Sequence, residues 1–138
     1  MENQRLIMIK DIEIPKVENV HIVAIYEWNE EFTSQQWVVY LINNRSDTIS
    51  MAMVMSRGKS DDRRTSTLRH SLGDLEPQTS HKVELITEDV LGFTNEYLIT
   101  FFAENKLYER RFVFNPNAIS EENTTDVPVI DVKAVKAE

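Results

Sequence analysis

Clusters of turn-forming residues divide most of this chain into short segments, and this spacing constrains the fold more than any other feature. No long segment carries apolar residues at the i, i+3, i+4, i+7 spacing of an amphipathic helix. The segments are instead rich in β-branched and aromatic residues. Several alternate apolar and polar residues, as strands with one buried face do. The chain is therefore predicted to be all-β.

The most apolar segment, residues 36–42 (Gln-Trp-Val-Val-Tyr-Leu-Ile), has apolar side chains on both faces, so we place it centrally in a sheet. The polar residues 43–47 that follow predict a turn into strand 48–56, so that the two strands form a hairpin. Residues 103–106 are predicted to form a four-residue hairpin loop. Further strands are expected at 6–14, 20–28, 65–72, 80–86, 96–102 and 107–114, with one helical turn within 87–95.

Seven or eight short strands separated by turns are typical of an immunoglobulin-like sandwich. We therefore predict a single immunoglobulin-like antiparallel β-sandwich over residues 5–114, followed by a C-terminal tail at 115–138. The tail is expected to be partly disordered or docked as an added strand. Its apolar stretch has the composition of a strand that adds to a sheet edge of this chain or of a partner. The residues of this possible interaction segment are Val127, Val129, Ile130 and Val132.

Composition and charge exclude several classes of protein. The chain has no cysteine, which rules out disulfides, thiol nucleophiles, cysteine-ligated zinc and iron–sulfur clusters. A net charge of −8 argues against a dedicated nucleic-acid-binding protein. The apolar run at residues 6–9 is too short for a signal-peptide core, and no stretch is long enough to span a membrane. The expected location is cytoplasmic, without membrane contact.

No catalytic or metal-binding motif emerges. The three histidines are His21, His70 and His81, and none stands at the spacing of a zinc site. The glycines Gly58, Gly73 and Gly92 form neither a phosphate-binding loop nor a nucleophile elbow. We therefore expect no catalytic residue, no metal and no cofactor, and we expect that the protein is not an enzyme.

A basic region is the strongest electrostatic feature. Residues 57–69 hold five cations and only two acids, Asp61 and Asp62, which gives a local charge of +3. Arginine suits bidentate capture of carboxylate or phosphate, so the region is a possible anion contact. The alternative is a solvated hairpin loop in which aspartates and arginines pair locally. The five cations are Arg57, Lys59, Arg63, Arg64 and Arg69.

Methionines and aromatic residues offer two further surfaces. Met51, Met53 and Met55 alternate with smaller residues and are expected to line the core, although an adaptable contact surface is the alternative. Trp37 is expected in the core, and Trp28, at a strand end, is expected to be exposed. Exposed aromatics would suit a carbohydrate platform, but that function requires export.

Two resemblances add to this interpretation. Residues 37–44 and 75–80 resemble the layout of CARDB-like and fibronectin type III-like domains. That resemblance implies a β-sandwich in which the Tyr97 hydroxyl bonds the backbone just upstream. Residues 11–15, 26–29, 65–71 and 95–97 make the chain similar to small uncharacterised Bacteroidetes-type proteins, many of which are called phenylalanyl-tRNA synthetase alpha subunit.

The synthetase name does not fit the residues, and we interpret it as a mislabel. A class II synthetase core needs a Gly-x-Gly-x-x-Arg motif, and the three glycines here stand far apart. The sequence instead predicts a non-catalytic protein-interaction module that self-associates through an edge strand or the tail. The alternative is binding of an anionic ligand or a tRNA-related RNA through the basic region.

Overall fold

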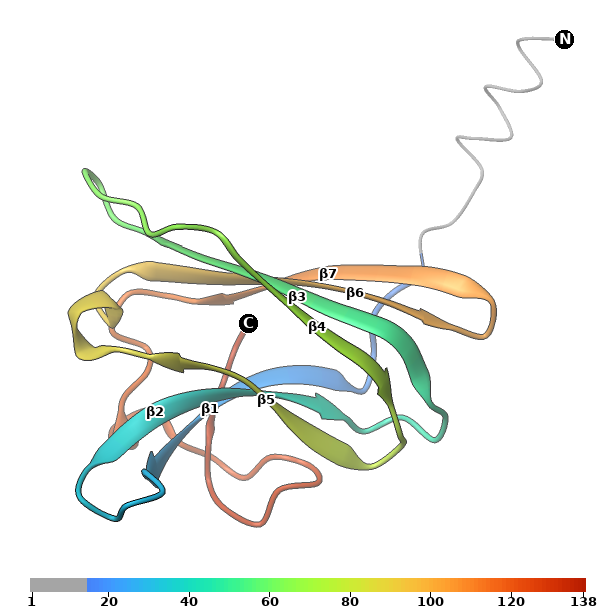
Figure 1. Cartoon of the computed structure of the whole chain (residues 1–138), viewed down its shortest axis with the longest axis horizontal. Coiled ribbons are helices and arrows are strands. Elements are labelled where there is room, and N and C mark those ends of the chain that lie inside the picture. The colour runs from blue at the N-terminus through green and yellow to red at the C-terminus, as the bar shows by residue number, and fades with distance from the viewer. Residues whose placement is uncertain (1–14) are drawn as a thin grey trace, which may run out of the picture.

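The protein is a sandwich of two four-stranded sheets, seen as two layers in Figure 1. The computed structural model describes residues 15–138. Sheet A has the order β5-β2-β1-β8 and sheet B the order β4-β3-β6-β7, with every pairing antiparallel. The prediction of an all-β sandwich is confirmed. The strand expected at 6–14 lies outside the described residues.

The strands follow the segments rich in β-branched and aromatic residues, and two short 3₁₀ turns separate some of them. The turn η1 lies within the region where one helical turn was expected, which confirms that prediction. The elements are β1 (Val20–Trp28), β2 (Gln35–Asn43), β3 (Ile49–Lys59), β4 (Leu68–Leu75), β5 (Thr79–Ile86), η1 (Glu88–Val90), β6 (Thr94–Ala103), β7 (Lys106–Phe114), η2 (Glu121–Asn123) and β8 (Val135–Lys136).

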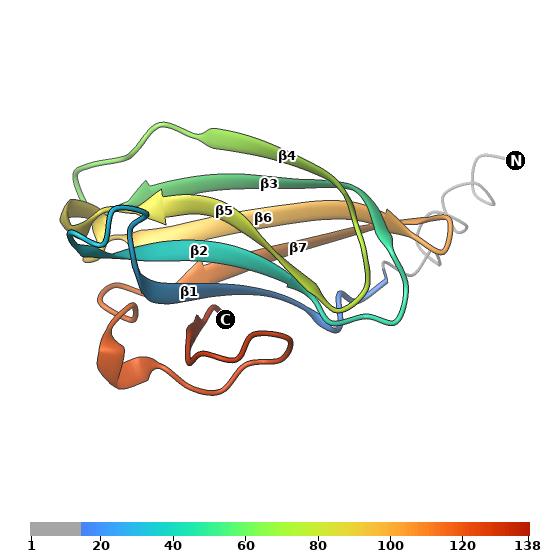
Figure 2. The same cartoon turned by 60° about the horizontal axis from the view of Figure 1, so that its bottom comes forward.

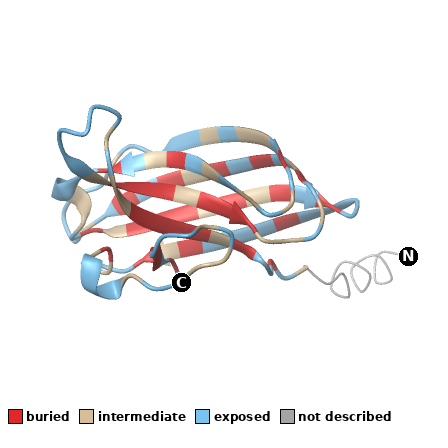
Figure 3. Ribbon diagram, turned by 90° about the horizontal axis from the view of Figure 1, so that it is seen from below, coloured by how far each residue is buried: buried red, intermediate tan, exposed pale blue. Residues whose placement is uncertain are grey.

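The core fills the space between the sheets, and buried residues alternate with exposed ones along the strands (Figure 3). From sheet A, Ile22 and Leu41 point inward, and from sheet B, Phe101 and Phe112 meet them. Trp37 is buried there beside Tyr26, with ring centroids 4.9 Å apart. The expected core position of Trp37 is confirmed. Burial of these large side chains is the main source of stability for such a fold.

The predicted hairpin between residues 36–42 and 48–56 is wrong. β2 pairs with β1 and β5, whereas β3 pairs with β4 and β6. Residues 44–48 therefore cross from sheet A to sheet B. A polar cluster favours a turn, but it does not say whether the next strand returns to the same sheet.

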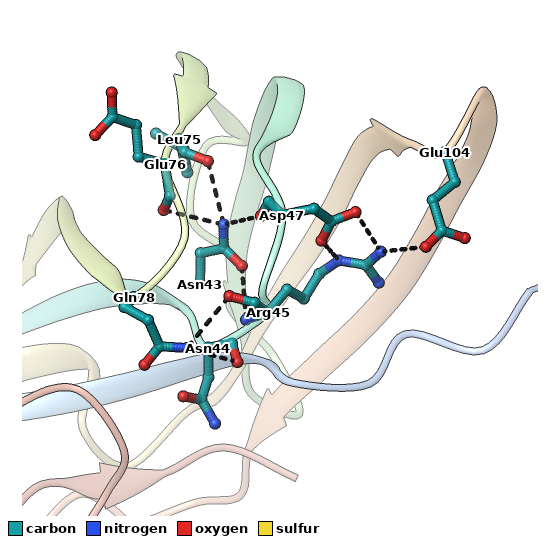
Figure 4. Close-up of polar contacts among 8 residues, drawn as sticks. All are labelled: Asn43, Asn44, Arg45, Asp47, Leu75, Glu76, Gln78 and Glu104. Carbon is teal, nitrogen blue, oxygen red and sulfur yellow. Dashed lines mark hydrogen bonds and ion pairs between the residues drawn. The ribbon is translucent and has the colours of Figure 1, made fainter.

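Asn43 ties this crossing to a second one (Figure 4). Its buried amide nitrogen lies 3.1 Å from the backbone oxygens of Asp47, Leu75 and Glu76. Its side-chain oxygen accepts a bond from the Arg45 amide at 3.0 Å. Leu75 and Glu76 lie where the chain leaves β4 for β5, in the opposite sheet. One side chain thus joins both connections that link the sheets at this end.

Several strand boundaries differ from the sequence-based expectation. β3 runs to Lys59, whereas 48–56 was predicted. β4 begins at Leu68 and ends at Leu75, whereas 65–72 was predicted. The β6–β7 hairpin is present, but its loop has two residues, not four. Glu104 and Asn105 both have positive φ, 52° and 62°. This is the left-handed pair that a type I′ turn requires.

The C-terminal tail packs on the sandwich, as Figure 2 shows below β1. β8 pairs with β1, and Glu138 exchanges two backbone hydrogen bonds of 2.9 Å with Val113 of β7. The tail therefore links the edges of both sheets. Val127 and Ile130 pack against Val23, Ile25 and Ile42 and cover the outer face of sheet A.

The predicted strand at the segment of Val127, Val129, Ile130 and Val132 is wrong. These residues form an irregular loop, and the added strand lies just beyond them at β8. Pro128 lacks a backbone donor, and Val129 has a φ of 73°, which lies outside the extended region of a regular strand. Composition therefore indicated that the tail adds a strand but misplaced it.

Candidate functional site

The basic region predicted to contact anions is partly neutralised within the chain. Arg57 Nε, Lys59 Nζ and Arg111 Nη2 lie 3.0, 3.1 and 2.6 Å from the Glu96 carboxylate. The Arg111 hydrogen bond is the main cause that lowers the pKa of Glu96 to about 2, with Lys59 and Arg57 adding to it. Glu96 is a buried residue, so this cluster holds β3, β6 and β7 together.

The five predicted cations do not converge on one site. Arg57, Lys59 and Arg64 line a hollow of about 270 Å³. Arg63 instead lies over the ring of Phe93, 5.3 Å from its centroid. Arg69 stands on β4 beside Met55. Arg57 and Lys59 share one face of β3, whereas Arg63 and Arg64 lie in the loop between β3 and β4.

Of the four residues proposed as an interaction segment, two are partly buried and two are exposed. Val127 and Ile130 pack on the outer face of sheet A, and Val129 and Val132 are exposed on the loop. None of the four is in a strand. The segment therefore serves as a cover for this chain's own sheet.

The expected core position of the methionines is wrong, because they lie on the outer face of sheet B. Met51 is 70% exposed and Met53 is 42% exposed. Ile49 points into the core, but the register shifts between Ile49 and Ala52, and Met51 has a φ of 53°. This irregularity reverses the faces of β3, so that Ala52 and Val54 become the buried residues.

The methionines belong to a larger apolar surface, the sheet B face. From β6 and β7, Phe102 is 42% exposed and Leu107 is 51% exposed. Monomeric proteins rarely expose contiguous large apolar patches, and such patches mark interaction sites. We define the sheet B face by the residues Met51, Met53, Met55, Leu98, Phe102 and Leu107.

Charges flank the sheet B face with opposite signs at its two ends. Met55 pairs with Arg69 and Leu98, and Leu98 pairs in turn with Arg111. One step along, Thr100 pairs with Met53 and with Glu109. Beyond this row lies Asp74, whose carboxylate accepts a 3.1 Å bond from the Met51 amide. The face is thus basic toward Arg57 and acidic toward Asp74.

A hollow of about 60 Å³ lies at the basic end, between Met55, Leu98 and the Glu96 cluster. In contrast, the tail covers the outer face of sheet A. The tail packs over Val23, Ile25 and Ile42 of sheet A, whereas no such cover from this chain's described residues lies over the sheet B face.

A second polar cluster, which the sequence did not predict, lies between the sheets. Glu84 accepts hydrogen bonds from Ser56 Oγ at 2.6 Å and Tyr97 OH at 3.0 Å, and His70 Nε2 lies 2.7 Å away. The irregular register at Val39 and Tyr40 turns Glu84 inward from β5. Burial, together with the nearby carboxylate, raises the pKa of Tyr97.

This Glu84 cluster joins sheet A to three strands of sheet B. The expected tyrosine corner is wrong, because the Tyr97 hydroxyl bonds a side-chain carboxylate and not the upstream backbone. His70 contacts Glu84, and within residues 15–138 no hydrogen bond joins it to Ser56. The geometry therefore lacks the serine–histidine contact of nucleophilic catalysis.

No group of three or more potential metal ligands occurs within residues 15–138. In the same part of the chain, no helix is long and apolar enough to cross a bilayer. Comparisons with protein-family models, with curated proteins and with solved structures give no match for this chain.

Proposed function

We propose that this protein is a non-catalytic protein-interaction module that self-associates through the sheet B face. The observation that carries the proposal is the group of exposed apolar side chains across β3, β6 and β7, of which Met51 and Leu107 are exposed by 70% and 51%. Methionine is flexible and polarisable, which suits a surface that packs against another protein.

The charge pattern favours a second copy as the partner. Two copies can meet face to face about a two-fold axis that lies in the plane of the interface and runs perpendicular to the strands. The axis passes between Met53, which is level with Glu109, and Met55, which is level with Arg111. Each Met55 then lies over Met53 of the partner subunit. Arg111 lies near Glu109 of the partner subunit, so the basic end of one copy meets the acidic end of the other.

This proposal changes the route of self-association that the sequence suggested. The tail is used within the chain, where β8 pairs with β1 and Glu138 pairs with Val113. The same contacts occupy part of the β7 edge. The exposed sheet face is therefore a better candidate than the tail.

Sedimentation velocity over a wide range of protein concentration tests the proposal. The wild-type protein is expected to form a dimer, and Met53→Glu is expected to shift it to monomer because a charge would be buried at the centre of the interface. Val132→Glu places the same charge on another exposed apolar position and is the matched control. A monomeric wild-type protein at all concentrations would overturn the proposal.

A second candidate function is anion binding at the hollow lined by Arg57, Lys59 and Arg64. Its support is that these three cations line one hollow together with Thr65 and Thr67. Inorganic phosphate and a tRNA at low salt are suitable probes, because phosphate contacts weaken steeply with added salt. Binding should fall on Arg64→Ala and not on Arg45→Ala, which changes a cation at the opposite end of the sandwich.

The finer assignments from the sequence are also proposals. We infer an immunoglobulin-like, fibronectin type III-like class, and the strand order supports it. Strands β1, β2 and β5 share one sheet and β3, β4, β6 and β7 the other. Relationship to the Bacteroidetes-type proteins and a cytoplasmic location belong to the same proposal.

A further inference from the structure

A cleft of about 590 Å³ lies at the β1–β2 hairpin, on sheet A and away from the sheet B face. This volume is within the range of small-molecule sites. Its walls come from the end of β1, from the hairpin loop and from Leu85 of β5. Neither the predicted interaction residues nor the Glu96 cluster contribute to it.

Large apolar side chains line this cleft at the surface. Trp28 is 54% exposed, as the sequence predicted, and Phe32 is 76% exposed. Leu85 is exposed beside them because the irregular register of β5 turns Glu84 inward in its place. Two aromatic rings that serve no core are characteristic of a binding surface.

The loop that presents the aromatic rings is held in one conformation by Asn29. The Asn29 side-chain amide donates to Thr33 Oγ1 at 2.9 Å and to Ser34 Oγ at 3.2 Å, and its oxygen accepts from the Thr33 amide at 2.9 Å. The Phe32 amide bonds the Asn29 backbone oxygen at 3.0 Å. Phe32 has a φ of 56°, which is rare for a bulky residue. A loop fixed in this way loses little entropy when it binds.

Carboxylates surround the rings and set the charge of the ligand. Glu27, Glu30 and Glu31 line the cleft with Lys82 as the one cation among its lining residues. Glu27 is already bonded by the Tyr40 hydroxyl at 2.6 Å. Glu30 and Glu31 form no ion pair within residues 15–138. Aromatic faces with nearby carboxylates attract organic cations, tryptophan most strongly.

We propose that this cleft binds a cationic side chain, of the guanidinium or alkylammonium kind, on a protein or peptide. The cation lies against Trp28 and Phe32, and Glu30 and Glu31 neutralise its charge. The apolar part of the same side chain packs on Leu85. This inference is independent of self-association, because it uses other residues at the end of the other sheet.

Titration with N-acetyl-arginine amide, followed through the two tryptophan indole N–H resonances, tests the proposal. N-acetyl-citrulline amide is the matched probe, because it replaces the guanidinium with a neutral urea of similar shape. The Trp28 resonance is expected to shift saturably with the arginine probe and about tenfold more weakly with the citrulline probe. The resonance of buried Trp37 serves as an internal control.

Variants identify the site. Trp28→Ala is expected to abolish saturable binding, and Glu30→Gln with Glu31→Gln to weaken it about fivefold. Glu121→Gln with Glu122→Gln, on the exposed turn η2, removes the same charge elsewhere and should change nothing. Equal shifts with both probes, or binding that survives Trp28→Ala, would overturn the proposal.

Discussion

Phe102 and Leu107 face each other across the β6–β7 ladder, and both keep about half of their surface exposed, 42% and 51%. Cross-strand apolar pairs normally stabilise a sheet by packing on a further layer. Here the next layer is missing from the chain's described residues, whereas the tail supplies it for sheet A. The sheet B face is thus the surface at which a second copy would complete the packing.

The first prediction concerns this pair. Leu107→Ser should change the free energy of unfolding of the monomer by less than about 1 kcal/mol, since exposed positions contribute little. The same change should weaken dimer formation at least about tenfold, because an apolar contact at the interface is lost. Chemical denaturation at low protein concentration gives the first quantity, and sedimentation gives the second. If the free energy of unfolding falls as much as the free energy of dimer formation, Leu107 contributes to the fold and not specifically to the interface.

Acid stability is predicted from the Glu96 cluster. The folded-state pKa of Glu96 is lowered from 4.5 to about 2, mainly by Arg111, so the charged carboxylate stabilises the fold above the ordinary pKa. That stabilisation is lost as the pH falls from about 4.5 toward 2. Glu96→Gln should cost about 2 kcal/mol at neutral pH, because the cations are partly exposed and screened.

The difference in free energy of unfolding between wild type and Glu96→Gln should shrink as the pH falls from about 4.5 toward 2. Urea denaturation at a series of pH values measures it. Glu122→Gln, on an exposed turn, is the control and should show no such difference. A difference in free energy of unfolding between wild type and Glu96→Gln that does not change with pH would contradict the assigned role of the carboxylate.

Asn43 is predicted to be a main structural contact between the sheets. Asn43→Ala removes the side-chain amide that donates to the backbone carbonyl groups of Asp47, Leu75 and Glu76. The buried carbonyl group of Leu75 then loses this hydrogen bond. The expected cost is about 2–3 kcal/mol of unfolding free energy. Gln78→Ala removes exposed bonds to Asn44 and Arg45 and should cost less than about 1 kcal/mol. Similar losses for both variants would contradict this role.

The tail is predicted to be part of the folded domain. Deletion of residues 134–138 removes β8, the buried residues Ala134, Val135 and Ala137, and the backbone bonds of Glu138 to Val113. The free energy of unfolding should fall by at least about 3 kcal/mol. Val132→Ser, in the exposed part of the tail, should cost under about 0.5 kcal/mol. Unchanged stability after the deletion would show that the tail is dispensable.

Local sequence was sufficient for the strands but not for their partners. Alternating and β-branched segments gave the all-β class, the buried Trp37 and the exposed Trp28, since these properties depend on neighbouring residues. β2 and β3 belong to different sheets, and Asn43, at the crossing between them, bonds residues 32 and 33 positions away. Such contacts leave no signal in the spacing of turn residues.

Backbone irregularities account for the largest errors at the candidate sites. A register shift and a positive φ at Met51 moved the methionines to the surface, and a shift in β5 moved Glu84 inside. One displaced residue reverses every later side chain of a strand. The basic residues were recognised as a group, but the partner of Arg57 is Glu96, 39 residues away.

Mixing two charge-reversal variants tests self-association through the sheet B face most directly. Glu109→Arg places two cations side by side on β7, and Arg111→Glu places two acids there. Arg57 and Lys59 remain as partners of Glu96 in the second variant, and urea denaturation checks that both variants fold. Each variant alone is predicted to be monomeric in sedimentation velocity, because like charges meet across the two-fold axis. An equimolar mixture is predicted to sediment as a dimer. A mixture that stays monomeric, while the wild-type protein dimerises, would contradict the proposed interface.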